Sequence, residues 1–256
     1  MHLMVLGRGD LEMYSEANIS ELNRCMAELT ERFQNMLLSF SMVQSKLSKD
    51  RAQEYLMQGA GRRFRLLYHC ILNVYRIFPP GRKEFLTDGE LVQVCINLHA
   101  FYVDLFGLLD NIAWVVVHEG ELADQIQRTR VGLYSKEMQK HLNSAFSSFL
   151  NSKRMTKWHN CHLKDFRDAL AHRIPLYVPP YGQDKETGEK FVFPAFSHSL
   201  NPLEEGEAMK LHPQLLADFN SAYAILEKFF EFEFGVIVES SKFWKEISAA
   251  LEDNRV

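Results

Sequence analysis

Long segments in which apolar residues recur at helical spacing are the feature that most limits what this 256-residue chain can fold into. In the segment that ends at Lys49, steps of four and three residues alternate through Leu22, Met26, Leu29, Phe33, Met36, Phe40, Val43 and Leu47. This heptad seam predicts a long helix. Packing within an antiparallel bundle is the expected setting, and an intermolecular coiled coil is the alternative.

Start and stop signals mark two helices in the first third of the chain. Asn18-Ile19-Ser20-Glu21 has the form of a capping box at the start of the first helix. Asp50 is expected to cap a second helix. That helix should end near Phe78, because Pro79-Pro80-Gly81 cannot continue it.

The same signals predict three further helices before residue 175. Thr87-Asp88-Gly89-Glu90 is another capping box, and it opens a third helix that should end near Gly120. A fourth helix is expected over 135–150, and a fifth, short one should stop before Pro175. The inward residues of the fourth helix are predicted to be Met138, Leu142, Ala145, Phe146 and Phe149.

Residues 174–212 break the helical pattern and contain most of the prolines. A small hairpin is expected there, with the strands 176–178 and 191–193 on either side of the polar turn 182–188. Pro213 should then open a last helix that passes through Ile237 and bends before Phe243.

Together these patterns predict an all-α fold, an up-and-down helical bundle with a long N-terminal helical arm and one irregular Pro-rich insertion. We expect residues 1–80 to form an N-terminal helical hairpin packed on the bundle. Residues 81–256 should form the main helical domain, which includes the insertion 174–212. The net charge of −4 argues against a protein that coats nucleic acid through bulk charge.

Cysteine usage and apolar runs predict a cytoplasmic location. The four cysteines form no CxxC pair and are expected to be reduced. The apolar run 112–117 is too short to cross a bilayer, so no membrane partner is expected.

The main candidate for chemistry is the octet Phe166-Arg167-Asp168-Ala169-Leu170-Ala171-His172-Arg173. Asp168 and His172 are four residues apart and share one helix stripe, so Asp168 can accept a hydrogen bond from the imidazole and orient it. Arg167 and His172 are five apart and are rotated by roughly 140° about the helix axis. Arg167 could therefore serve the site of a second subunit. The spacing itself is weak, because Arg154 and His159 repeat it.

Basic residues surround the octet and suit a phosphate backbone. They include Lys164 and Arg173, and Tyr177 and Tyr181 lie just downstream, where bases could stack on them. The alternative is a solvated helix face on which His172 caps the last carbonyl groups.

The octet resembles the signature of the HEPN superfamily (higher eukaryotes and prokaryotes nucleotide-binding domains), which has Arg, a polar residue, a few further positions and then His. The upstream segment 104–114 is similar to the Leu-Asp-Asn-Leu-Ala pattern in the long helix that packs beside the motif in several HEPN-like families. The resemblance covers residues 87–240.

Many members of this superfamily resemble metal-independent endoribonucleases, some in toxin or phage-defence systems. The resemblance implies that Arg167 and His172 form the catalytic pair, that Asp168 orients the histidine, and that two copies face one cleft in a homodimer. RNA is the implied substrate, and an antitoxin or nucleotidyltransferase is an implied partner. No cofactor or metal is expected.

Two further groups have open interpretations. Asp104, Asp110 and Asn111 either support the motif cleft or form a polar seam within the bundle. Arg62, Arg63 and Arg65, with Phe64, could contact nucleic acid, but a solvated helix face with one core aromatic is the expected interpretation. The alternative function for the whole chain is a non-catalytic interaction or antitoxin-partner module that uses the heptad seam as its surface.

Overall fold

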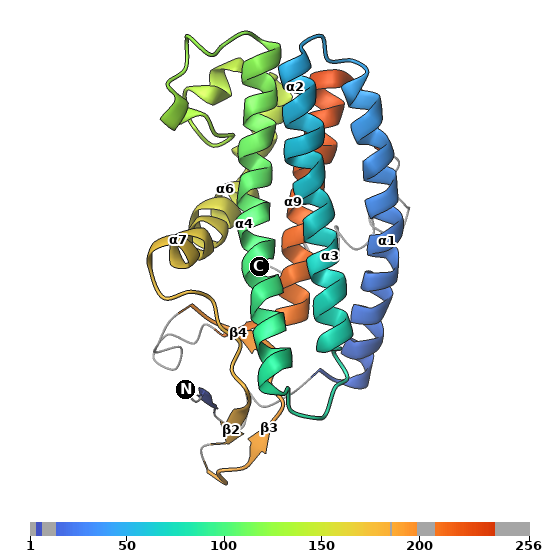
Figure 1. The fold of residues 1–256 in the computed structure, drawn as a ribbon, viewed down its shortest axis with the longest axis vertical. Coiled ribbons are helices and arrows are strands. Elements are labelled where there is room, and N and C mark those ends of the chain that lie inside the picture. Colours follow the sequence, from blue (N-terminus) through green and yellow to red (C-terminus); the bar gives the residue numbers. More distant parts are fainter. Residues whose placement is uncertain (1–3, 7–13, 185, 199–207, 239–256) are drawn as a thin grey trace.

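The computed structural model describes residues 4–6, 14–184, 186–198 and 208–238, and it is an all-α fold with a few short strands. Four long helical segments lie side by side (Figure 1). They are α1 (Glu16–Gln44), the segment from α2 (Asp50–Glu54) to α3 (Arg62–Ile77), α4 (Asp88–Glu119) and α9 (Leu211–Phe234). α9 contacts α1, α3 and α4, and none of its residues is exposed.

The heptad seam of α1 faces the interior of its own chain. Leu29, Met36 and Val43 are completely buried. Phe33 stacks on Tyr68 of α3 with ring centroids 4.0 Å apart. The bundle interpretation of the seam is confirmed. The proposals of an intermolecular coiled coil and of a seam that acts as an interaction surface are wrong, because the seam residues pack in the core.

The predicted start of α1 is wrong by a few residues. Ser15 is the N-cap: its hydroxyl accepts from the Asn18 backbone N–H, and Asn18 reaches back to the Ser15 backbone N–H. The capping box is therefore 15–18 and not 18–21. By contrast, the box from Thr87 to Glu90 and the helix end at Gly120 are confirmed.

The second predicted helix is confirmed as one continuous segment over Asp50–Ile77, with Lys49 and not Asp50 as its N-cap. Its middle, Tyr55–Gly61 (η2), is a π-helix that ends in the two glycines Gly59 and Gly61. Such π segments are often found near functional sites.

The predicted fourth helix is wrong over most of its length. Two single 3₁₀ turns, η3 (Arg128–Arg130) and η4 (Met138–His141), precede a short helix, α5 (Ser144–Leu150). Asn143 interrupts the helix because its side chain accepts from the Ala145 backbone N–H and caps α5. Ala145, predicted to be inward, is exposed.

A helical arm lies beside α4, on the side of α4 away from α1 (Figure 1). It comprises α6 (Lys153–Trp158), the π-helical turn η5 (His159–Leu163) and α7 (Lys164–His172), which carries most of the octet. We call residues 153–172 the arm. The short helix predicted before Pro175 is thereby confirmed.

The Pro-rich insertion contains the expected hairpin, with shifted strands. β2 (Gly182–Asp184) pairs antiparallel with β3 (Lys190–Phe191), and β1 (Met4–Leu6) adds to β2 in parallel. The turn is tighter than predicted because Asp184 Oδ1 accepts two backbone N–H groups, from Glu186 and Thr187. Residues 176–178 lie outside this hairpin.

A second small sheet closes the insertion. β4 (Ala195–Phe196) pairs with β5 (Met209–Lys210), and the Tyr177 backbone bridges to Ser197. α9 follows at Leu211 and ends at Phe234, where Gly235 adopts a left-handed conformation with φ 62°. The predicted continuation of this helix through Ile237 is wrong, and the bend before Phe243 lies outside the described residues.

The predicted boundary near residue 80 falls between α3 and α4, and helices from both sides of it share one hydrophobic core. Within the described ranges, α4 is the one helix long and apolar enough to cross a membrane by length and composition. Half of its most apolar window is buried in the bundle, as expected for a core helix of a bundle.

Candidate functional site

The octet is held on the bundle by the apolar side of α7. Phe166 and Ala169 are buried, and the Phe166 ring packs edge-on against Tyr102 of α4 with centroids 4.7 Å apart. These contacts fix which way the rest of α7 faces. Arg167 and Asp168 are left half-buried, and His172 is exposed at the end of the helix.

Arg167 lies against the middle of α4. Its guanidinium carbon is 4.5 Å from the centroid of the Phe106 ring, a distance at which a cation is attracted to the ring face. Its buried Nε is 3.0 Å from Oδ1 of Asp168, but the angle does not make a hydrogen bond. The arginine is therefore held in place by an aromatic ring and an ion contact.

Asp168 does not orient His172, and that part of the prediction is wrong within one subunit. Its carboxylate turns toward Arg167. His172 forms no hydrogen bond or ion pair with any residue that the structure describes, and so it does not cap the carbonyl groups of α7 either. Arg167 and His172 occupy different faces of α7, as the helix geometry predicted.

A second arginine enters the site from the bundle. Arg63 of α3 reaches α4, where its Nη1 donates to Oδ1 of Asp104 at 2.6 Å and its Nε donates to Oδ1 of Asn111 at 3.0 Å. Asp104 and Asn111 thus hold an arginine of α3, a contact that is compatible with both expected interpretations, support of the motif cleft and a polar seam within the bundle. The expectation that Arg63 belongs to a solvated face is wrong, although Arg62 and Arg65 are exposed.

Two glycines make room for these contacts. A Cβ on Gly107 of α4 would lie 2.5 Å from the Arg63 guanidinium carbon, far below any normal contact. A Cβ on Gly59 of the π-helical turn would lie 2.8 Å from the Asn111 side chain. Arg63 therefore lies directly on the α4 backbone, which only a glycine at 107 permits.

Asp110 lies within the electrostatic influence of both arginines. Burial raises the pKa of its carboxyl to about 6, while the charges of Arg167 and Arg63 act in the opposite direction. No described residue hydrogen-bonds to this carboxyl. Burial also raises the pKa of Asp104, against the influence of Arg63. We call Arg63, Arg167, Asp104, Asp110, Asn111 and Asp168 the two-arginine cluster.

The structure separates the predicted RNA-binding residues. Lys164 is exposed on α7, whereas Arg173 is paired with Asp165 at 2.6 Å. Tyr177 is half-buried, its backbone bridges to Ser197, and burial raises its pKa. Tyr181 packs on Phe85 ahead of α4 and carries the Lys190 ammonium 4.3 Å above its ring.

Tyr181 is thus far from the two-arginine cluster. The start of α4 and Phe106 are 18 residues apart, which corresponds to roughly 27 Å along a helix. Of the four predicted RNA-binding residues, Lys164 has the exposure and the place on α7 that the prediction needs.

His159 closes the other side of the arm. Its ring stacks on Tyr134 with centroids 3.8 Å apart, and burial lowers its pKa. The neighbouring Cys161 is exposed. In the part of the chain that the structure describes, no three His, Cys, Asp or Glu side chains are grouped to hold a metal ion.

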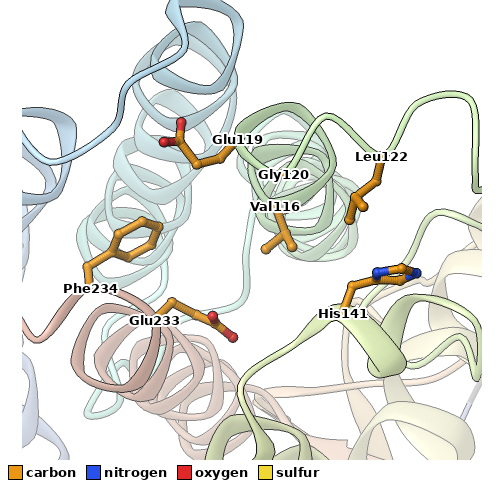
Figure 2. A pocket seen from close by; sticks show the side chains of 7 residues that line it. All are labelled: Val116, Glu119, Gly120, Leu122, His141, Glu233 and Phe234. Carbon is orange, nitrogen blue, oxygen red and sulfur yellow. The ribbon is translucent and has the colours of Figure 1, made fainter.

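A pocket of about 310 Å³ lies elsewhere, where the C-terminal ends of α4 and α9 meet the 120–141 segment (Figure 2). It is lined by Val116, Glu119, Gly120, Leu122, His141, Glu233 and Phe234.

The two carboxylates of this pocket point in different directions (Figure 2). Glu119 accepts from the backbone N–H groups of Ser48 and Lys49, and Glu233 accepts from that of Asn143. Burial raises the pKa of Glu233. Both carboxylates therefore hold loops in place, and no octet residue takes part.

No protein family, curated protein or solved structure matches the chain.

Proposed function

We propose that the chain is a HEPN-like endoribonuclease that works without a metal ion, in which Arg167 of one subunit and His172 of another meet in a homodimer cleft. The observation that carries this proposal is the state of the two side chains. His172 is exposed and makes no hydrogen bond or ion pair with the described part of the chain, while Arg167 is held half-buried on another face of the same short helix. A pair that one subunit cannot assemble can be assembled by two.

The proposed roles follow from the chemistry of each group. His172 takes the proton of a ribose 2′-hydroxyl as its oxygen attacks the adjacent phosphorus, or gives a proton to the leaving 5′ oxygen. The new 2′ O–P bond forms as the P–O5′ bond breaks, which leaves a cyclic phosphate and a 5′-hydroxyl. Arg167 stabilises the negative charge that develops on the phosphoryl oxygens.

An exposed apolar stripe on α4 supports the homodimer. Val92, Ile96 and Val103 are each more than half exposed, at 55%, 53% and 51%. They are separated by four and seven residues, a spacing that places them along one outer face of the helix. This stripe runs toward Phe106 and the two-arginine cluster, so a second copy seated on it would also lie beside Arg167.

The stripe also favours a second candidate function, a non-catalytic helical module that binds another protein, such as an antitoxin or nucleotidyltransferase partner. Both candidates use α4, but only the first requires His172 and Arg167 to act on RNA.

RNA cleavage in the presence of EDTA distinguishes the two candidates. The wild-type chain should cleave single-stranded RNA, and His172→Ala should reduce the rate by at least about a hundredfold, the lower range for one general acid–base group. His198→Ala is the matched control. This histidine pairs with Asp165 of α7 and has no proposed role in the reaction.

A second arm uses mixed dimers. Mixing His172→Ala with Arg167→Ala should restore part of the activity, because one of the two sites in a mixed dimer then keeps both groups. Cleavage that persists in His172→Ala would overturn the assigned roles, and failure of the mixture to regain activity would place the pair within one subunit. Complete absence of cleavage by the wild-type chain favours the interaction module.

A further inference from the structure

We propose that Arg63 and Arg167 together form a phosphate-binding site on the outer face of α4, which holds a backbone phosphate of the RNA strand. The inference rests on the proposed function for the identity of the ligand, and it adds to that function a residue outside the octet. Arg63 is 104 positions away from Arg167 in the sequence and belongs to a different helix.

Both arginines have N–H donors that no described residue accepts. A guanidinium has five N–H donors in a fixed planar arrangement. Arg63 directs Nε and Nη1 at Asn111 and Asp104, and its Nη2 donates to no described residue. Arg167 spends its Nε on the contact with Asp168, and neither of its terminal nitrogens donates to any part of the described chain.

The two guanidinium groups are ordered before any anion binds. The Arg63 side chain is 35% exposed and that of Arg167 is 36% exposed, so each guanidinium is positioned by protein on one side and open to solvent on the other. Arg63 is oriented by two hydrogen bonds and Arg167 by the Phe106 ring. Side chains already ordered in this way lose little entropy when they bind an anion.

Asp110 of α4 places a half-buried carboxyl near both arginines. Arg63 lies against Gly107 and Arg167 lies over the ring of the adjacent Phe106, so both arginines reach the same level of α4, and both charges act on the Asp110 carboxyl. The carboxyl has no described hydrogen-bond donor, and its burial is costly for the charged form. A phosphate bound between the arginines would repel this carboxylate, so that Asp110 takes up a proton when the phosphate binds. Asp104, Asp168 and His159 are the other titratable groups beside the two arginines.

Gly107 is the structural condition for the site. A Cβ at this position would lie 2.5 Å from the Arg63 guanidinium carbon and would push Arg63 away from α4 without removing its charge. The site therefore makes a prediction about geometry that a general positive surface does not make.

The test measures RNA binding by fluorescence anisotropy in the presence of EDTA. The probe is a fluorescent single-stranded RNA whose 2′-O-methyl groups prevent cleavage. Arg63→Gln should weaken binding about tenfold, the effect of one charged hydrogen bond. It should also reduce the slope of log affinity against log salt by about 0.7. Arg62→Gln is the matched control. It removes the same charge from the neighbouring residue, whose side chain is exposed, and it should change the affinity less than about twofold.

Three further variants exclude misfolding as the cause. Arg63→Gln/Asp104→Asn leaves no unpaired charge on the half-buried carboxylate, and it should still bind RNA more weakly than the wild type because the Arg63 guanidinium is missing. Gly107→Ala should also bind weakly. Asp110→Asn should bind RNA several-fold more tightly, which a damaged protein would not do. In the wild type the affinity should fall as the pH rises from 5 to 7 and Asp110 loses its proton, and this fall should be absent from Asp110→Asn.

The outcomes separate the inference from the proposed function. If Arg63→Gln binds RNA like Arg62→Gln, or Asp110→Asn binds more weakly than the wild type, the phosphate site is refuted, even where His172 proves catalytic. If Arg63 governs binding but the wild type never cleaves RNA, the inference stands and the endoribonuclease does not. A site that binds inorganic phosphate in an Arg63-dependent way, but binds RNA independently of Arg63, would refute the assignment to an RNA backbone.

Discussion

Asp218 joins the helices that position the octet, and removal of one of its hydrogen bonds gives a sharp test of the structure. The carboxylate is 2% exposed in α9. It accepts from Tyr102 of α4 at 2.8 Å, from Trp158 of α6 at 2.8 Å and from Gln214 at 2.9 Å. The arm therefore connects to both α4 and α9 through a single buried acceptor.

The perturbation is Tyr102→Phe. The ring of Tyr102 is completely buried and packs against Phe166 of the octet, and Phe keeps that ring while it removes the hydroxyl donor. A hydrogen bond to a charged group contributes about 1.5–3 kcal/mol. Since Gln214 still donates to the same oxygen, we expect a loss of stability near the lower end, about 1.5–2 kcal/mol. For a chain of this size, that corresponds to a fall in Tm of roughly 3–8 °C.

Tyr134→Phe is the matched control. The Tyr134 hydroxyl is buried and has no hydrogen-bond partner among the described residues. Because its removal relieves an unsatisfied polar group, this variant should be neutral or more stable by up to about 1 kcal/mol. The same chemical change thus gives opposite signs at two buried sites.

The measurement is urea unfolding followed by circular dichroism at 222 nm, at pH 7, for the wild type and both variants. Similar m-values are required, so that the difference in midpoint reports stability. If Tyr102→Phe and Tyr134→Phe change stability equally, Asp218 does not act as a charged acceptor at this site. The account of how the arm is anchored would then be refuted.

Two further predictions concern the core and the surface. Burial lowers the pKa of His212 to about 4, so the unfolded chain binds a proton that the folded chain does not, and stability should fall as pH drops from 6.5 toward 4, by up to about 3 kcal/mol. Urea unfolding measured across this pH range should show this dependence of stability on pH in the wild type and not in His212→Gln. An equal dependence in both proteins would contradict the role of His212. Ile96→Lys, in the exposed stripe of α4, should convert a dimer to a monomer in sedimentation velocity, whereas Ile237→Lys, 77% exposed beyond α9, should leave the dimer intact. A wild type that is monomeric at tens of micromolar would refute the stripe as a dimer surface.

Local signals predicted those elements whose ends are set by local contacts. The helix α4 is an example: Thr87 and Glu90 satisfy each other's backbone donors at its start, and Gly120 ends it. Pro79 and Pro80 stop the preceding helix for an equally local reason. The seam of α1 was likewise predictable, since burial of one apolar stripe needs no knowledge of the partner helix.

Elements decided by competition between local options were predicted less well. Apolar residues at Met138, Leu142 and Phe146 have helical spacing and are all buried, yet they do not belong to one helix. Asn143 lies between them, and its side chain caps a new helix at α5. The four-residue spacing was the same for a continuous helix and for an interrupted one, so periodicity could not distinguish them.

The placement of Arg63 on α4 was missed because its partners are 41 and 48 residues away and its neighbours Arg62 and Arg65 are exposed. A signal for it was nevertheless present on α4. Gly107 costs a helix interior about 1 kcal/mol relative to Ala, and nothing in the apolar pattern of α4 requires it. Asp104 and Asn111 lie three residues before and four residues after this glycine, so they share one face with it. A glycine that lies between a carboxylate and an amide on one helix face indicates that a large donor side chain rests against the backbone there. Arg63 fills this position, with planar donors that reach both Asp104 and Asn111 across the glycine.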